Sequence, residues 1–92
     1  MNFVEDYFKG KISKDDLPPV YGKKQVDEEL IKKVFANIER HGICQIIFNT
    51  TNEDEHYSLA RDLQRTLEHL DKKFKFIITK DYFTCVIYKK EI

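Results

Sequence analysis

The C-terminal segment constrains the fold most, because every second residue is apolar through two consecutive runs, while the residues between them are mixed. The runs are FKFIIT over 74–79 and YFTCVIY over 82–88. Alternation with a period of two is typical of β-strands that bury one face. A two-residue loop at Lys80-Asp81 pairs the runs as an antiparallel hairpin with one apolar face, whereas a shift by one residue mixes the faces. The inner pairs are Ile78 with Phe83, Phe76 with Cys85, and Phe74 with Ile87.

The sequence is compatible with two lengths for the loop of this hairpin. Lys-Asp is not a favoured two-residue turn, and a four-residue loop keeps the same two faces. In either arrangement the second face has a mixed character. It carries Lys75, Ile77, Thr79, Tyr82, Thr84, Val86 and Tyr88.

Two amphipathic helices are predicted before the hairpin, on either side of a short apolar strand. The first begins near Asp27, a favourable N-cap, and ends at Gly42, where glycine suits a left-handed cap. The strand is ICQIIFN over 43–49. The second helix follows overlapping cap signals at Thr51 and Asn52. Its continuous apolar face comprises His56, Leu59, Ala60, Leu63, Leu67 and Leu70.

Residues 1–24 are predicted to form an N-terminal arm, made of a short amphipathic helix and a linker that contains two prolines. The helix ends at Gly10 and has one apolar stripe, which consists of Phe3, Val4, Tyr7 and Phe8. So short a helix does not persist alone in water, so we expect it to dock on its own domain or on a partner. Residues 10–24 are expected to be a linker or a surface loop, because Pro18-Pro19 favours polyproline II.

These elements predict an α+β fold, a small two-layer sandwich formed by residues 25–92. The order is helix, linker, helix, strand, helix, strand, strand. A right-handed strand–helix–strand crossover leaves its two strands parallel, so the sheet is three-stranded and mixed, with the two main helices on one face. The other face is then uncovered unless the N-terminal helix or a second subunit covers it.

The charge balance and the cysteine content limit the classes of function. The 92 residues carry 16 basic and 16 acidic side chains, so the chain lacks the surplus of positive charge that many nucleic-acid-binding proteins have. Cys44 and Cys85 lie in apolar runs, which favours reduced, buried thiols in a cytoplasmic protein. We expect no membrane association, because neither a signal peptide nor a membrane-spanning apolar run is visible.

The first functional hypothesis is a small non-enzymatic regulatory or inhibitory protein that acts through protein–protein contact. Small accessory proteins of bacteria, phages and mobile elements often have this plan, which is an analogy of size alone. The contact surface would be the N-terminal helix or the uncovered sheet face, the latter also suited to self-association. Its expected residues are Phe3, Tyr7, Phe8, Lys75, Tyr82, Thr84 and Tyr88.

The alternative hypothesis is a module that binds single-stranded nucleic acid. Tyrosines interleaved with lysines on a sheet can stack bases and hold phosphates. In addition, Arg65-Thr66-Leu67-Glu68-His69 resembles the single-strand-binding domains named for their Arg-x-x-x-His signature. The resemblance covers these five residues, without that family's Gly- and Ser-containing turn, and implies nucleic-acid contact by this helix. The residues expected in this role are Arg61, Arg65, His69, Lys73, Lys89 and Lys90.

Pro18-Pro19-Val20-Tyr21 fits the Pro-Pro-x-Tyr pattern bound by WW-type domains. A stretch of this kind can dock in an aromatic-lined groove. The same residues also suit a stiff spacer, with Val20 and Tyr21 packed on the domain. Both interpretations stay open.

The sequence offers little for catalysis. His41 and Cys44 are near neighbours, but Cys44 is expected in the core, whereas a reactive cysteine needs an exposed, electropositive site. The acidic residues at 53–55 suit a helix N-terminus. Neither a zinc-ligand pattern nor a glycine-rich phosphate loop is visible. We therefore expect a non-enzyme without metal or cofactor.

Overall fold

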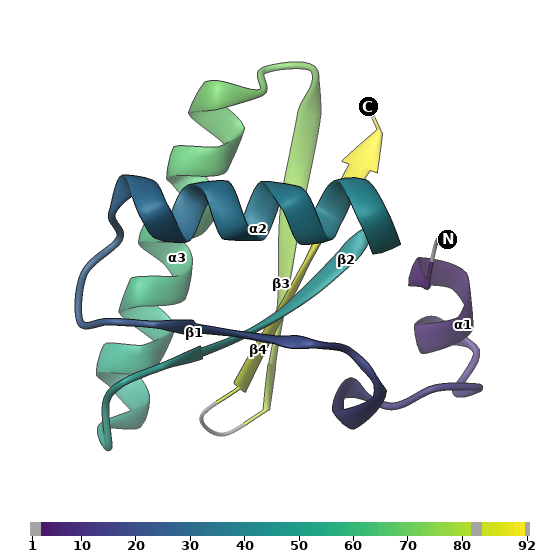
Figure 1. Ribbon diagram of the computed structural model, residues 1–92, viewed down its shortest axis with the longest axis horizontal. Helices are drawn as coiled ribbons and strands as arrows, with labels where there is room; N and C mark the ends of the chain where they lie inside the picture. The colour runs from purple at the N-terminus through teal and green to yellow at the C-terminus, as the bar shows by residue number, and fades with distance from the viewer. Residues whose placement is uncertain (1–2, 82–83, 92) are drawn as a thin grey trace.

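The computed structural model describes residues 3–81 and 84–91 of the chain. It has an α+β fold with three helices and a four-stranded mixed sheet, so the predicted class is confirmed and the predicted number of strands is wrong. In chain order the elements are α1 Val4–Phe8, a 3₁₀ turn η1 at Lys14–Asp16, β1 Pro19–Gly22, α2 Glu28–His41, β2 Ile43–Phe48, α3 Glu53–Leu70, β3 Phe74–Asp81 and β4 Thr84–Glu91 (Figure 1).

The strands lie in the order β1-β2-β4-β3. β1 is parallel to β2, β4 is antiparallel to β2, and β3 and β4 form the antiparallel hairpin. β2 and β3 therefore run in the same direction, as the strand–helix–strand rule predicts. They are not neighbours, because β4 is inserted between them.

β1 is the strand that the sequence interpretation missed. The expectation that residues 10–24 form only a linker or surface loop is wrong for Pro19–Gly22, which pair with β2 in the register Pro19↔Gln45 to Gly22↔Phe48. Val20 is buried in the core on the helix side of the sheet. Proline is tolerated here because it is the first residue of an edge strand.

The predicted hairpin faces are confirmed, and the predicted pairing is wrong. Ile78 pairs with Ile87 and Asp81 with Thr84, so Lys80 and Asp81 belong to β3 and not to the loop, and the predicted partner Phe83 lies outside the described residues. Each β3 residue pairs four positions further along β4 than predicted. An even shift leaves both faces unchanged. Phe76, Cys85 and Ile87 are accordingly fully buried.

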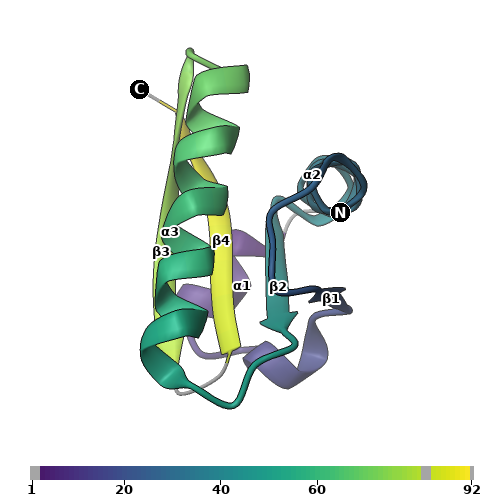
Figure 2. The ribbon, with the colours of Figure 1, turned by 90° about the vertical axis from the view of Figure 1, so that its left-hand side faces the viewer.

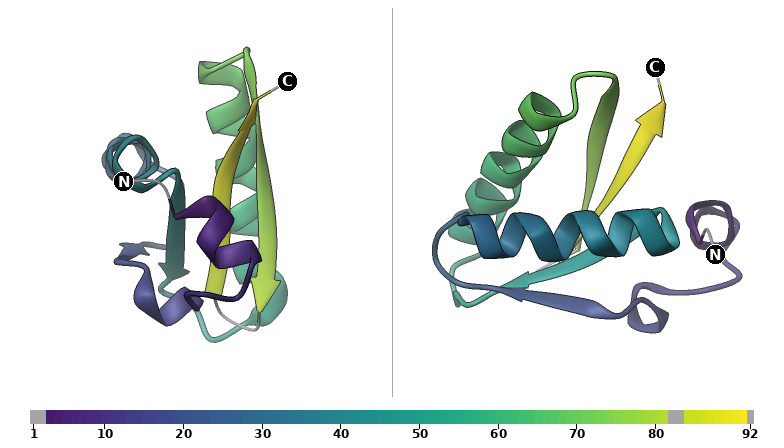
Figure 3. Two further views of the ribbon diagram at one scale, coloured as in Figure 1. Left: turned by 90° about the vertical axis from the view of Figure 1, so that its right-hand side faces the viewer. Right: turned by 45° about the horizontal axis from the view of Figure 1, so that its top comes forward.

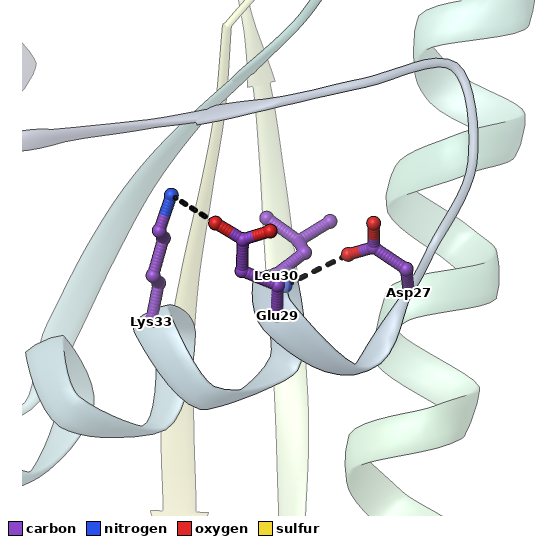
Figure 4. A network of polar contacts seen from close by, with 4 residues as sticks. All are labelled: Asp27, Glu29, Leu30 and Lys33. Atoms are coloured by element: carbon purple, nitrogen blue, oxygen red, sulfur yellow. Dashed lines mark hydrogen bonds and ion pairs between the residues drawn. The ribbon is translucent and has the colours of Figure 1, made fainter.

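Both main helices begin at side-chain caps. Oδ1 of Asp27 accepts the backbone N–H of Leu30 at 2.9 Å, and one turn of α2 is further linked by the Glu29–Lys33 ion pair (Figure 4). α2 ends at Gly42, whose φ of 79° is the predicted left-handed cap. Asn52 caps α3 by accepting the N–H of Glu55. The cap signals therefore predicted the helix bounds closely.

α2 and α3 cover one face of the sheet. α3 lies along β3 and β4, and α2 lies beside β1 and β2 (Figure 2). The main core between these layers contains Val20, Leu30, Val34, Ile38, Cys44, Ile46, Phe48, Leu59, Ala60, Leu63, Leu67, Phe76, Cys85 and Ile87. His56 is also fully buried there.

α1 and η1 cover part of the opposite face of the sheet (Figure 3). Leu17, Ile43 and Val86 form a second buried cluster there, against which residues of the N-terminal arm and Tyr88 pack. The expectation of a fully uncovered face is therefore wrong, and the alternative in which the N-terminal helix covers it is the one observed. Along the described residues, no helix combines the length and the apolar character needed to span a membrane.

Gln45 fastens the arm to this face. It projects from β2 and is buried, with 5% of its surface exposed. With its amide oriented to satisfy both contacts, Nε2 donates to the carbonyl oxygens of Lys14 at 2.6 Å and Leu17 at 3.1 Å. A buried amide that satisfies two backbone carbonyls fixes the position of η1 and the strand that follows.

Candidate partner interface

α1 is anchored through Phe3, its N-cap residue. The ring of Phe3 stacks on His41 at the end of α2, with ring centroids 5.1 Å apart and an interplanar angle of 11°. The backbone N–H of Phe3 also donates to the carbonyl oxygen of His41 at 2.7 Å. Tyr7 packs with the second cluster. Phe3 and Tyr7, both expected to contact a partner, thus serve largely to dock α1.

Phe8 is the last residue of α1 and contacts β4 of the sheet. Its ring meets that of Tyr88 on β4 edge to face, with centroids 4.9 Å apart. Phe8 nevertheless keeps 53% of its surface exposed. Two aromatic rings from distant parts of the sequence are therefore brought together at the surface.

Two cross-strand pairs continue this surface along the hairpin. Ile77 is the direct partner of Tyr88, and Lys75 is the direct partner of Lys90. Direct partners in an antiparallel pair share a face of the sheet. We call this surface the outer strip and define it as Phe8, Lys75, Ile77, Tyr88 and Lys90.

The Lys75–Lys90 pair gives the outer strip its charge. Like charges placed directly opposite each other destabilise a sheet. Both lysines are exposed, and neither has a carboxylate partner among residues 3–81 and 84–91. The strip thus has an aromatic and aliphatic half beside a cationic half whose repulsion an anionic group would relieve.

The remaining predicted partner residues lie elsewhere or outside the described residues. Thr84 is four residues from Tyr88 along β4, about 13 Å away at the usual rise of a strand. Its hydroxyl accepts a hydrogen bond from Nζ of Lys14 at 3.1 Å. Tyr82 is not among the described residues. The structure therefore brings together Phe8, Lys75 and Tyr88 of the predicted set, and it does not bring Thr84 to them.

The sequence did not predict Ile77 or Lys90 among the partner-binding residues, although both lie in the outer strip. The spacing of the hairpin residues predicts Ile77 on this face, and its pairing with Tyr88 confirms that placement. Lys90 was assigned to the nucleic-acid set. The hairpin register is the signal that joins them, because it places Lys90 opposite Lys75.

The residues expected to bind nucleic acid do not form one surface. Lys89 is on the helix side of the sheet, where Nζ lies 3.4 Å from Oδ2 of Asp71 and 4.1 Å from the centre of the Phe74 ring. Lys90, its neighbour in sequence, is on the opposite face. Lys73 is exposed in the turn before β3.

The arginines of that set lie on the solvent side of α3. Arg61 and Arg65 line a hollow of about 420 Å³ together with Tyr57, Ser58 and Asp62. Nη1 of Arg65 is 3.5 Å from Oδ1 of Asp62, which offsets part of the positive charge. His69 is exposed one turn beyond Arg65.

The Pro-Pro-Val-Tyr segment is built into β1. Pro18 and Pro19 are exposed, Tyr21 is 69% exposed, and Val20 is buried. Binding of this segment in polyproline II form would require β1 to separate from β2 and Val20 to leave the core. Exposing a buried valine costs about 1.5–3 kcal/mol.

The two thiols are buried. Desolvation raises the pKa of Cys44 from 9.0 to about 12, so its thiol stays protonated at neutral pH. Among the described residues, no group of three or more His, Cys, Asp or Glu side chains is placed to hold a metal ion.

No protein-family model matches the chain, and no curated protein or solved structure matches it either.

Proposed function

We propose that this protein is a small non-enzymatic regulatory or inhibitory protein that acts by docking on another protein through the outer strip. The observation that supports the proposal is the pair formed by the exposed ring of Phe8 and the partly buried ring of Tyr88, beside the directly opposed Lys75 and Lys90. Protein interfaces are enriched in aromatic residues at their centres, where a few such side chains provide most of the binding energy.

The chemistry of the strip defines the kind of protein surface it fits. A complementary partner has an apolar patch against Phe8, Ile77 and Tyr88, and one or two carboxylates against Lys75 and Lys90. The carboxylates would neutralise a charge pair that is unfavourable in the free protein. Self-association through this strip is disfavoured, because a second copy brings the same two lysines to the contact.

A comparative capture experiment tests this proposal. Immobilised wild-type protein, the Phe8→Ser/Tyr88→Ser variant and the Tyr57→Ser control are each incubated with lysate of the source organism, and captured proteins are quantified by mass spectrometry. Tyr57 is a suitable control because it is an exposed tyrosine on α3, away from the strip. We expect a protein that wild type and control retain and the double variant loses. Retention of the same proteins by all three would contradict the proposed surface.

A single-stranded nucleic acid is the second candidate partner, favoured by the position of the Tyr88 ring next to the Lys75–Lys90 pair. Such a ring stacks on a base while lysines hold the adjacent phosphates. Polarisation titrations with labelled single- and double-stranded oligonucleotides at low salt distinguish the two candidates. Binding that weakens steeply with salt, and weakens further in Lys75→Glu/Lys90→Glu, supports this candidate. An unchanged polarisation signal removes it.

A further inference from the structure

The groove between α2 and α3 is a second exposed apolar surface, separate from the outer strip. Its volume is about 540 Å³. Ile31 and Phe35 from α2 line it on one side, and Leu70 from the end of α3 lines it on the other. Leu70 has 58% of its surface exposed. The groove thus presents apolar surface that the fold itself leaves partly exposed to water.

Glu28 and Lys32 lie at the rim of this groove and are four residues apart on α2. The neighbouring residues Glu29 and Lys33 have the same spacing and form an ion pair, with 3.2 Å between Nζ and Oε1 (Figure 4). In the described part of the chain, neither Glu28 nor Lys32 has an ion-pair partner. One negative and one positive group therefore remain available, about 6 Å apart along the helix axis and on either side of Ile31.

We propose that a second copy of this chain docks on the groove about a two-fold axis, with the two α2 helices antiparallel. This arrangement places Glu28 of each copy against Lys32 of the other. An antiparallel two-fold contact is the geometry in which such a charge pair is complementary to itself. The two ion pairs would flank Ile31 of both copies. Phe35, one turn beyond Lys32, and Leu70 line the same groove and would add apolar burial outside the two ion pairs.

The charge pattern favours a copy of the chain over an unrelated partner. A two-fold contact between two copies brings Glu28 of each copy to Lys32 of the other, so it uses one acidic and one basic residue at this spacing. Binding of an unrelated partner does not require that the groove carry both charges. The surface is small, because α2 spans 14 residues, about 21 Å. We therefore expect a weak dimer that depends on concentration.

Sedimentation equilibrium of the full chain, from about 1 μM to about 1 mM, tests the proposal with charge variants. Glu28→Lys and Lys32→Glu should each raise the dissociation constant at least about tenfold, because each places like charges together twice per dimer. The double variant Glu28→Lys/Lys32→Glu should restore dimerisation. An equimolar mixture of the two single variants should form a heterodimer, since every contact then pairs opposite charges.

Two further variants separate this contact from general effects of charge and folding. Glu29→Lys makes the same change in net charge on the other side of α2, and we expect it to leave the dissociation constant unchanged. Leu70→Ser removes exposed apolar surface and should weaken the dimer without unfolding the chain. Wild-type protein that stays monomeric up to the highest concentration overturns the proposal. Equal effects of Glu28→Lys and Glu29→Lys, or a double variant that stays monomeric, also overturn it.

Discussion

Nδ1 of His56 lies 3.3 Å from Sγ of Cys85, in a part of the core where both residues are fully buried. Nε2 of the same ring accepts the backbone N–H of Phe48 at 3.2 Å. This second bond places the ring proton on Nδ1, directed towards the sulfur. One side chain of α3 thus joins β2 to β4 through polar contacts inside an apolar layer.

Replacing His56 with alanine should strongly destabilise the protein. The change leaves the buried N–H of Phe48 without its acceptor and opens a cavity, so we expect the free energy of unfolding to fall by about 3–5 kcal/mol. Urea denaturation followed by circular dichroism measures the difference. His69→Ala is the matched control, since His69 is exposed on the same helix and should change stability by less than about 0.5 kcal/mol. A similar loss in both variants would contradict the structural role assigned to His56.

Replacing Gln45 with leucine should loosen the N-terminal arm. The carbonyl oxygens of Lys14 and Leu17 then lose their buried donor, and we expect a loss of about 1–3 kcal/mol. Hydrogen exchange measured by mass spectrometry should become faster in the peptide that contains residues 13–17. Gln25→Leu is the control, because Gln25 is exposed before α2. Unchanged exchange of that peptide in Gln45→Leu would show that the arm is held by other contacts.

Cys44 should make the stability depend on alkaline pH. Its pKa is raised from 9.0 to about 12 by burial, so the folded protein keeps the proton that the unfolded chain releases. The associated stability is complete below pH 9 and declines as the pH rises towards 12. At pH 10 the loss should be about 1 kcal/mol. Because lysines and tyrosines also titrate there, the measurement is the difference in slope between wild type and Cys44→Ala over pH 8–10.5. Parallel slopes would exclude this effect.

Gly22→Ala should test whether β1 is an integral part of the sheet. A Cβ at this position would lie 2.7 Å from Cδ1 of Phe48, whose ring is buried and cannot move away cheaply. We expect a loss of about 1–3 kcal/mol from overpacking. Lys23→Ala, at the exposed next residue, should be nearly neutral. If the two variants unfold at the same urea concentration, β1 does not pack as described.

Local chemistry predicted the helices and the faces of the hairpin. Asp27 and Gly42 are caps whose effect depends on their own backbone neighbours, so the bounds of α2 follow from the sequence. The side of the sheet on which Phe76 and Cys85 lie follows from the alternation of side chains, whichever loop joins the strands. These features require no knowledge of distant parts of the chain.

Features that depend on distant partners could not be predicted. β1 is four residues long and includes a proline, so it has no periodic signal of its own and becomes a strand only by pairing with β2. The pairing of Lys75 with Lys90 depends on which residues form the turn. The N-terminal arm covers part of the outer face with the help of Gln45, which bonds to Lys14 and Leu17. These partners are distant in sequence, so the residues around Gln45 give no sequence signal for the contact.

The insertion of β4 between β2 and β3 has a consequence for protein synthesis. A nascent chain that has emerged only as far as Asp81 has β1 and β2 available to pair, and β3 without a neighbouring strand. The two halves of the sheet become continuous only when residues 84–91 enter between them. Until then β3 lacks its paired strand, although α3 can already pack on it, and the unpaired edge of β3 stays open in the period when chaperones bind incomplete folds.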